Sequence, residues 1–261
     1  MTQQENDTQR LSYLAHQLRL CNFSKKCASV IHQAQIDRPT YMDFLIGLFT
    51  GELADREAYK RVRSRALAQL PKDCDLDRFD FNHPSGITKP QMRELRQLVW
   101  LDQIYNILLM GPCGTGKTFI ASGLVSDAVN KGYRAIFTTM EDLISTIRLR
   151  ELSPSAMAKY NRLTKVQLLA IDDIMLFPMQ KDEAVGFFNL INTLHEQASI
   201  IVTTNKAPSE WAQTMQDPAL AAAILDRLLY HCDVIKLEGN SYRMAHRKSF
   251  SGQSPVSPGM G

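Results

Sequence analysis

A glycine-rich segment, GPCGTGKT from Gly111 to Thr118, has the residue types and spacing needed to hold the phosphates of a nucleotide. It follows the apolar run YNILLM and precedes FIASGLVSDAVN, which suits a helix. Glycines let backbone N–H groups at a helix start turn toward phosphate oxygens, while Lys117 adds positive charge and the Thr118 hydroxyl can ligate Mg²⁺. A chance glycine-rich turn is the alternative. The strand before and the helix after favour a site for ATP with Mg²⁺, built on Gly111, Pro112, Cys113, Gly114, Thr115, Gly116, Lys117, Thr118 and Phe119.

Two adjacent acids end a second apolar run, LLAIDD, at Asp172 and Asp173. Ligands bind at the carboxyl ends of the strands in an open parallel sheet. We expect Asp172 to hold Mg²⁺, directly or through water, and Asp173 to orient the water that attacks the γ-phosphate. Acids that merely cap the next turn are the alternative. Because aspartate is one methylene shorter than glutamate, the sequence leaves open whether hydrolysis is brisk or slow.

Three more polar residues occupy suggestive places. Asn205 ends the run SIIVTTN, where its amide can hydrogen-bond the γ-phosphate or the attacking water. Arg227 interrupts the apolar run ALAAAILDRLLYH, and Arg243 lies in GNSYRMAHRK. Asparagine often just starts a turn, and isolated arginines are usually solvated. These residues alone therefore assign no role to either arginine.

The elements that must position these residues follow from the apolar pattern. After Pro90, short apolar runs alternate with amphipathic helices, which is typical of an α/β fold with a parallel sheet. Four of the five runs are nearly continuous, as expected for strands buried on both faces. The predicted strands cover residues 104–110, 135–138, 167–171, 200–203 and 234–237.

The N-terminal part has a different pattern. Helical spacing of apolar residues predicts a small all-helical domain over residues 1–70 that should end before Pro71. Residues 71–90 contain three prolines and several aspartates, so we expect a linker. The ATPase domain should then cover residues 91–247. The Gly, Pro and Ser content of residues 248–261 predicts a disordered tail.

Composition limits the remaining possibilities. The 261 residues suffice for one main core and a small appendage, and the net charge of +3 makes any basic surface a matter of local clustering. Five scattered cysteines without a CxxC pair support neither a zinc site nor a disulfide framework. The polar N-terminus, and the lack of any apolar run near the ~18 residues that span a bilayer, predict a soluble cytoplasmic protein without membrane contact.

Taken in order, the motifs resemble those of the AAA+ ATPases in the group of helicase loaders and transposition helpers. The chain is most similar to the IstB-type helpers of insertion sequences, over roughly residues 75–247. The motifs that carry this similarity are GPCGTGKT, IIVTTNKAPSEW, DPALAAAILDRLLYH and LEGNSYR. Asp173 departs from the glutamate of many members, and Thr-Thr-Asn replaces the more common Thr-Ser-Asn. The resemblance implies a Walker A loop at Gly111 to Thr118, Walker B acids Asp172 and Asp173, sensor 1 Asn205, arginine finger Arg227 and sensor 2 Arg243.

The resemblance also implies partners. Subunits of this group assemble side by side into rings or helical filaments with ATP at each junction, and they wind along DNA. The transposition helpers engage a DDE-type transposase, with the helical N-terminus as the partner-binding part. Basic residues support contact with the phosphates of double-stranded DNA without base reading, although a solvated helix surface explains the first cluster equally well. The candidates are Lys60, Arg61, Arg63 and Arg65, followed by Arg148, Arg150, Lys159 and Arg162.

Three other functions compete with this one. A DnaC-like loader of a replicative helicase would have the same nucleotide-binding motifs. Only the amino-acid sequences around SEW and AAAILDRL favour the transposition helper. A small-molecule kinase would need an arginine-bearing lid and an acceptor pocket, whereas Asp173 and Asn205 suit hydrolysis. A scaffold that binds ATP and scarcely hydrolyses it stays open because of the aspartate at 173.

Overall fold

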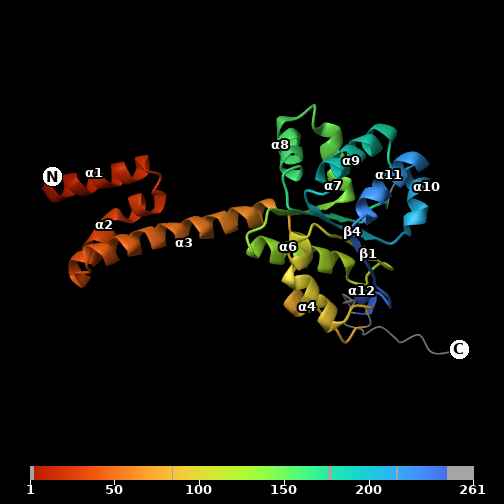
Figure 1. The fold of residues 1–261 in the computed structure, drawn as a ribbon, viewed down its shortest axis with the longest axis horizontal. Coiled ribbons are helices and arrows are strands. Elements are labelled where there is room, and N and C mark those ends of the chain that lie inside the picture. The colour runs from red at the N-terminus through yellow and green to blue at the C-terminus, as the bar shows by residue number, and fades with distance from the viewer. Residues whose placement is uncertain (1–2, 84, 176–177, 216, 246–261) are drawn as a thin grey trace, which may run out of the picture. The chain divides into compact units, whose positions relative to one another are not determined.

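The structure is a computed structural model that describes residues 3–83, 85–175, 178–215 and 217–245 (Figure 1). The chain divides into two compact units, residues 1–63 and 64–261. The predicted tail, residues 248–261, lies outside the described residues. No helix in the described ranges is long and apolar enough to cross a membrane.

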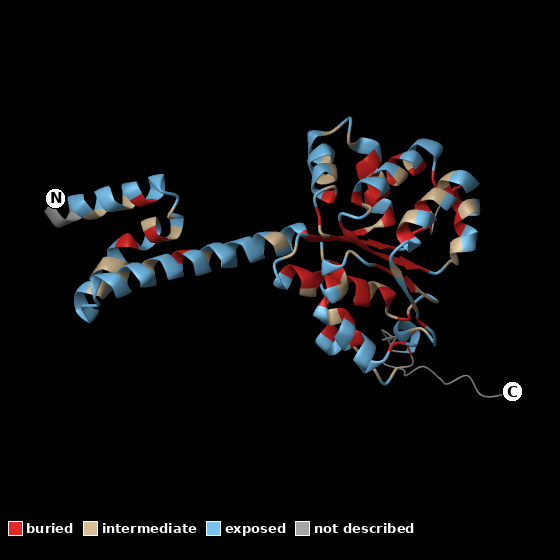
Figure 2. Cartoon of the chain, in the orientation of Figure 1, coloured by how far each residue is buried: buried red, intermediate tan, exposed pale blue. Residues whose placement is uncertain are grey.

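The first unit is helical, as predicted, but its core is small. Among its described residues, the buried apolar cluster consists of Ala15, Phe23 and Cys27, and Figure 2 shows most of the unit exposed. Buried Glu52 accepts the backbone N–H of Phe23 at 3.0 Å, so it satisfies a donor in the first turn of a helix, and Arg56 lies 3.0 Å from the same carboxylate. The helices are α1 (Gln3–Gln17), α2 (Cys21–Asp37) and α3 (Tyr41–Leu67).

The second unit has a five-stranded parallel sheet in the order β2-β3-β4-β1-β5, which confirms the predicted α/β class. All five predicted strands are present, with ends displaced by one or two residues. The inner strands are buried on both faces, whereas β5 lies at the edge and is partly exposed. The strands are β1 (Asn106–Met110), β2 (Ala135–Thr139), β3 (Leu168–Asp172), β4 (Ser199–Thr204) and β5 (Cys232–Lys236).

Two apolar layers sandwich this sheet because successive side chains of a strand point to opposite faces. Ile107 and Leu109 pack in one cluster with residues of α4 and α6, and Leu108 packs in the other with residues of α7, α9, α10 and α11 (Figure 1). The helices of this unit are α4 (Lys89–Gln97), α5 (Val99–Asp102), α6 (Lys117–Asn130), α7 (Met140–Leu149), α8 (Pro154–Leu163), α9 (Lys181–Leu194), α10 (Trp211–Met215), α11 (Pro218–Leu229) and α12 (Tyr242–Ala245).

The stretch predicted as a linker, residues 71–90, belongs to the second unit and packs against its helices. It contains a short 3₁₀ turn, η1 (Leu76–Arg78), whose Leu76 is buried against α6. At Gly123 of α6 a side chain would lie 2.4 Å from a Leu76 carbon, so only glycine lets this approach occur. Arg96 ties the two elements together, since it bonds Asp127 of α6 and also Asp77. We call residues 71–83 and 85 the strap, because several of them line the pocket described below.

Candidate functional site

The phosphate loop joins β1, which ends at Met110, to α6, which begins at Lys117. Its glycine at 114 has φ +82°, and a side chain there would lie 2.1 Å from Ser241 Oγ. The Gly114 carbonyl accepts the backbone N–H of Tyr242 at 2.9 Å. The loop is thereby closed against the start of α12, which requires glycine at this position for both conformation and space.

A pocket of about 460 Å³ opens beside this loop at the carboxyl edge of the sheet. The phosphate loop, part of the strap and the predicted site residues Asp173, Asn205 and Arg243 all line this pocket. The residues that line it are Pro71, Asp73, Arg78, Phe79, Asp80, His83, Ser85, Cys113, Gly114, Thr115, Gly116, Lys117, Thr118, Phe119, Ser122, Asp173, Asn205, Tyr242 and Arg243.

Lys117 is buried in the curl of the loop. Its Nζ donates to the carbonyl oxygens of Gly111 and Pro112, each at 2.7 Å. Burial lowers the pKa of Lys117, and the nearby carboxylates of Asp173 and Asp172 oppose that shift. Anionic phosphate oxygens are stronger hydrogen-bond acceptors than neutral carbonyl oxygens. The Lys117 ammonium can therefore give up its bonds to the two carbonyls and donate to a phosphate when a nucleotide binds.

The Asp172 carboxylate is buried next to Thr118. Burial raises the pKa of Asp172, while hydrogen bonds from Thr203 and Thr118 act in the opposite direction. A carboxylate beside a hydroxyl is a set of hard oxygen donors, and Mg²⁺ is commonly bound by one or two such groups together with substrate phosphates and water. The two residues fit Mg²⁺ for this reason. Across the described ranges, no group of three or more His, Cys, Asp or Glu side chains forms an alternative metal site.

Asp173 and Asn205 both reach the pocket from the same sheet edge. Asp173 is exposed to it and has left-handed backbone, with φ +54°. The amide nitrogen of Asn205 lies 3.9 Å from the Cys113 sulfur of the phosphate loop. The structure therefore places both residues beside the loop, as the strand-end argument predicts, and their catalytic roles stay predictions.

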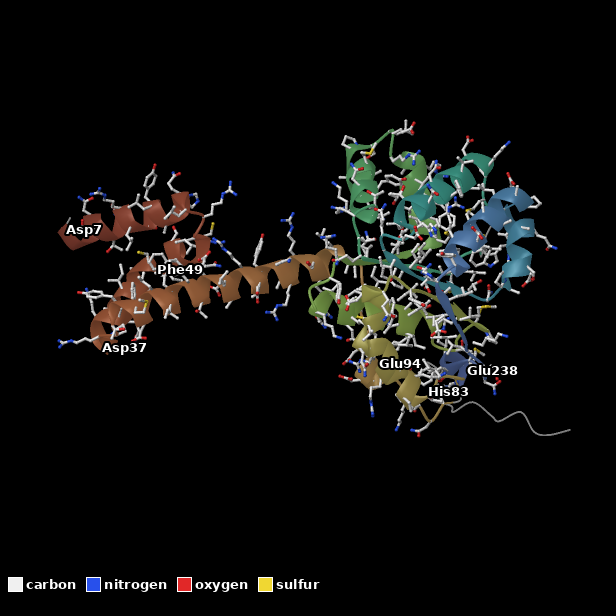
Figure 3. All side chains as sticks on the ribbon, in the orientation of Figure 1. Asp7, Asp37, Phe49, His83, Glu94 and Glu238 are labelled. Atoms are coloured by element: carbon white, nitrogen blue, oxygen red, sulfur yellow. The ribbon has the colours of Figure 1, made fainter. Side chains whose placement is uncertain are left out.

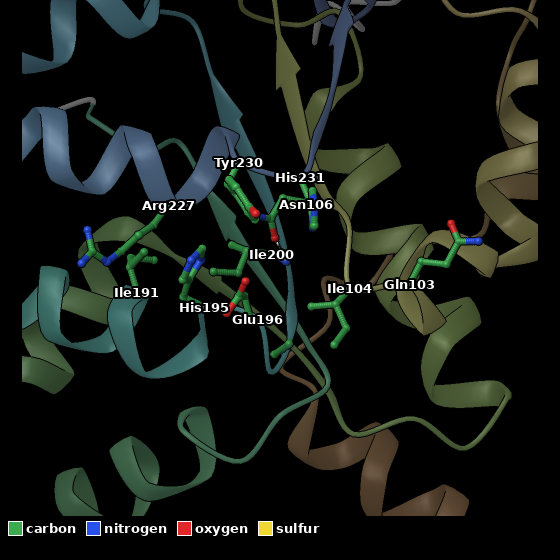
Figure 4. Close-up of a pocket in the computed structure, with 11 residues that line it drawn as sticks. Gln103, Ile104, Asn106, Ile191, His195, Glu196, Ile200, Arg227, Tyr230 and His231 are labelled. Atoms are coloured by element: carbon green, nitrogen blue, oxygen red, sulfur yellow. Dashed lines mark hydrogen bonds between the residues drawn. The ribbon is translucent and has the colours of Figure 1, made fainter.

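The two predicted arginines lie at opposite edges of the sheet. Arg243 lines the nucleotide pocket, where its charge adds to the lowering of the Lys117 pKa. Arg227 lines a different pocket, whose wall also includes Asn106 and Ile200 at the amino ends of β1 and β4; Figure 4 shows its side chain next to Ile191. Its guanidinium stacks 4.8 Å from the Phe188 ring centroid and donates to Asn192 Oδ1 and the Ala223 carbonyl, both at 2.9 Å.

The strap supplies pocket residues that the sequence patterns do not predict. The Phe79 ring packs edge-on against Phe81 at 4.9 Å and would lie 3.3 Å from a side chain at Gly116. The His83 imidazole lies 2.7 Å from the Asn240 carbonyl, and Figure 3 labels His83 among the side chains of the second unit. The available signal was the pair of phenylalanines in RFDFNH, because a solvated linker is expected to lack large aromatic side chains.

The candidate DNA-binding residues all lie outside the nucleotide pocket. Lys60, Arg61 and Arg63 are exposed on α3, and Arg65 donates to Ser126 of α6 at 3.4 Å. The second group lies on and next to α7 and α8, which form an insertion between β2 and β3. In that group Arg148 lies 3.8 Å from Glu183, Arg150 lies 5.0 Å from the ring centroid of Tyr160, and Lys159 and Arg162 are on α8.

The family model and the most similar relatives agree on one family of proteins. The model of the family described as IstB-like ATP binding protein matches residues 13–250. An IS21-like ATP-binding protein of Bacteroides fragilis is 45% identical over 241 residues, covering 92% of each chain. An IS21 ATP-binding protein of Pseudomonas aeruginosa is 33% identical over 238 residues, covering 91% of this chain and 90% of its own.

Solved structures show the same fold. A crystal structure of DnaI matches with a TM-score of 0.54 at 15% identity, covering 67% of this chain and 94% of that one. A crystal structure of the DnaC helicase loader matches with a TM-score of 0.52 at 16% identity, covering 64% and 98%. The central sheet with its phosphate loop is thus an AAA+ P-loop fold.

Replacing Gly114 by alanine should weaken ATP binding by about tenfold or more, because overpacking of ~1–3 kcal/mol would push Ser241 and α12 away from the loop. Gly132 is the matched control, since it also has positive φ (+93°) but nothing within 4 Å of an added side chain. Gly132→Ala should cost about 1 kcal/mol of folding stability and leave ATP affinity unchanged. Nucleotide titration and urea unfolding of both variants would check this, and equal ATP affinities would contradict it.

Proposed function

The chain belongs to the family of IstB-like ATP-binding proteins, and on this premise we propose that it is a cytoplasmic Mg²⁺-dependent ATPase that assembles on double-stranded DNA. Its assembly recruits or regulates the DDE-type transposase of the same insertion sequence. The observation that carries the proposal is the separation of the cationic groups: Lys117 and Arg243 face the nucleotide pocket, whereas Arg227 lies at the opposite edge of the sheet.

This separation supports a site shared between subunits. When copies stack head to tail, the amino edge of one sheet faces the carboxyl edge of the next, and such contacts build rings or filaments. Arg227 is prepared for this role, because the partners of its guanidinium among the described residues are a neutral amide and a neutral carbonyl, which leave its positive charge in place. Stacking on Phe188 holds the guanidinium in position before a phosphate arrives.

Within the shared site each residue has a defined task. Asp173 accepts a hydrogen bond from the attacking water and aims it at the γ-phosphorus, and Asn205 bonds that water or a γ-oxygen. Lys117, Arg243 and the neighbouring copy's Arg227 stabilise the charge that develops as the bond from the γ-phosphorus to ADP breaks. Thr118 and Asp172 would hold Mg²⁺, which would supply further positive charge at the phosphates.

Mixing two inactive variants tests the shared site. Lys117→Ala should abolish ATP turnover, and Arg227→Ala should lower it by ~10³-fold, the low end of what an arginine finger contributes. An equal mixture should recover about a quarter of the wild-type ATPase rate, since one junction in four then combines an intact pocket with an intact Arg227. The double variant in one chain is the control and should recover nothing. A mixture as inactive as its components would show that Arg227 does not act across a junction.

Contact with DNA is supported by basic side chains outside the pocket. Arg148 is 61% exposed, and its ion pair with Glu183 is long at 3.8 Å, so its guanidinium is accessible to a phosphate group. Arg162 lies in the last turn of the neighbouring helix α8. Phosphate contacts of this kind give affinity that falls with salt and does not depend on base sequence.

The double variant Arg148→Ala with Arg162→Ala should bind DNA more weakly in the presence of ATP. The plot of log affinity against log salt should become shallower by roughly one for each phosphate that the variant no longer neutralises. Fluorescence anisotropy with DNA duplexes of unrelated sequence measures both quantities. Arg93→Ala, an exposed site on α4, serves as the control and should change neither. DNA affinity that ignores salt, or no binding with ATP, would contradict the proposal.

The first unit supports a partner-binding role. A groove between α2 and α3 has an apolar lining, which includes Phe23, Phe44 and Leu48, and carries the acids Asp37 and Asp43. In this groove Gly47 and Gly51 have nothing within 4 Å of an added side chain, although glycine inside a helix costs ~1 kcal/mol relative to alanine. We assign the groove to an amphipathic helix of the transposase with basic flanking residues, which would complement the acids.

Gly47→Ala with Gly51→Ala should raise the free energy of unfolding by about 1 kcal/mol per site and yet weaken transposase binding, because the new methyl groups occupy the groove. Urea unfolding and calorimetric titration of the full chain with the purified transposase would measure the two effects. Ile46→Ala is the control, since Ile46 is exposed on the same helix but does not line the groove. Wild-type protein that binds a replicative helicase instead of the transposase would favour the DnaC-like alternative.

A further inference from the structure

Thr203 of β4 makes three hydrogen bonds to three consecutive residues, which are the last residue of β3 and the first two of the turn that follows it. Its hydroxyl donates to Asp172 Oδ1 at 2.6 Å and accepts the backbone N–H of Asp173 at 2.9 Å. Its carbonyl accepts the backbone N–H of Ile174 at 3.0 Å. The side chain is fully buried, with 0% exposure, so no water competes for these bonds.

The position of Thr203 follows from strand register. Ile171 of β3 pairs with Val202 of β4, so Thr203 lies opposite the residue at which β3 ends. At that point the chain turns through left-handed backbone at Asp173, a conformation that costs free energy for any residue other than glycine. The bonds from Thr203 to the residues on either side offset this cost and fix the turn.

The hydroxyl of Thr203 has a defined direction. Threonine has one hydroxyl proton, and the N–H of Asp173 can only donate, so the proton must point to Asp172. Asp172 is therefore bound as an acceptor. Thr204 differs, because its hydroxyl donates to the Lys206 carbonyl and accepts the Lys206 N–H.

We propose that Thr203 is a positioning residue that holds Asp172 for the metal and couples both acids to the strand that ends beside Asn205. The inference rests on the ATPase function proposed above. A change at the γ-phosphate that moves Asn205 is transmitted through β4 to the Asp172 carboxylate and to the backbone that carries Asp173. The hydroxyl thus makes the site respond to ATP with its metal rather than to ATP alone.

The test compares Thr203→Val, Thr203→Ser and Thr138→Val. Valine keeps the shape and removes the hydroxyl, and serine restores the hydroxyl. Thr138 is the control, a buried threonine of β2 whose hydroxyl donates only to the Thr139 carbonyl among the described residues. ATP affinity is measured with Mg²⁺ and with EDTA, and ATPase rate is measured with saturating Mg²⁺.

We expect Thr203→Val to lose about 10- to 100-fold of the affinity that Mg²⁺ adds, and a similar factor in ATPase rate, as is usual when a metal ligand loses its supporting hydrogen bond. Its affinity in EDTA should equal that of the wild type, and Thr203→Ser and Thr138→Val should behave like the wild type. Unchanged Mg²⁺ dependence in Thr203→Val would overturn the proposal. So would equal losses with Mg²⁺ and EDTA, since they would show a purely structural role. A wild type that never hydrolyses ATP would refute the ATPase function and leave the Mg²⁺ comparison as the test of Thr203.

Discussion

The phosphate loop can work only if its backbone is held still, and β1 provides that support because it lies between β4 and β5. On one side the N–H of Gly111 bonds the Thr204 carbonyl of β4 at 3.2 Å. On the other side the N–H of Leu237, just after β5, bonds the Met110 carbonyl at 2.6 Å. Every other part of the site is placed by this arrangement, because the ends of β3, β4 and β5 all meet the loop at one edge.

Two segments without regular strand structure complete the pocket from outside the sheet. The strap is anchored by Leu76 on α6 and by the bridge from Arg96, and the N–H of Glu238 reaches the Ser85 carbonyl at 3.2 Å. This contact links the strap to the segment that carries Arg243. A nucleotide in the pocket would therefore touch segments more than 150 residues apart in the chain, as the bond between His83 and Asn240 illustrates (|i−j| = 157).

The features that depend on local sequence pattern were predictable. Buried strands and the loop before α6 were predictable, because apolar runs and glycine spacing follow directly from strand burial and phosphate binding. The roles of the strap and of Thr203 were not predictable from the sequence, because they depend on contacts between segments that are distant in the chain. Leu76 against Gly123, or Thr203 against Asp172, leaves no periodic signal in the chain. The place of Arg227 at the far sheet edge likewise depends on how α11 packs.

The aspartate at 173 has a backbone explanation that the sequence alone could not supply. Its φ of +54° is left-handed, a region that aspartate and asparagine occupy several-fold more often than other residues with side chains because their short polar groups bond locally. A glutamate here would gain reach toward the pocket but fit this turn less well. Thr203 holds the same turn by three hydrogen bonds. The left-handed backbone of Asp173, its short side chain and the buried hydroxyl of Thr203 therefore depend on one another. A change in any one of them alters the position of the Asp173 carboxylate in the pocket.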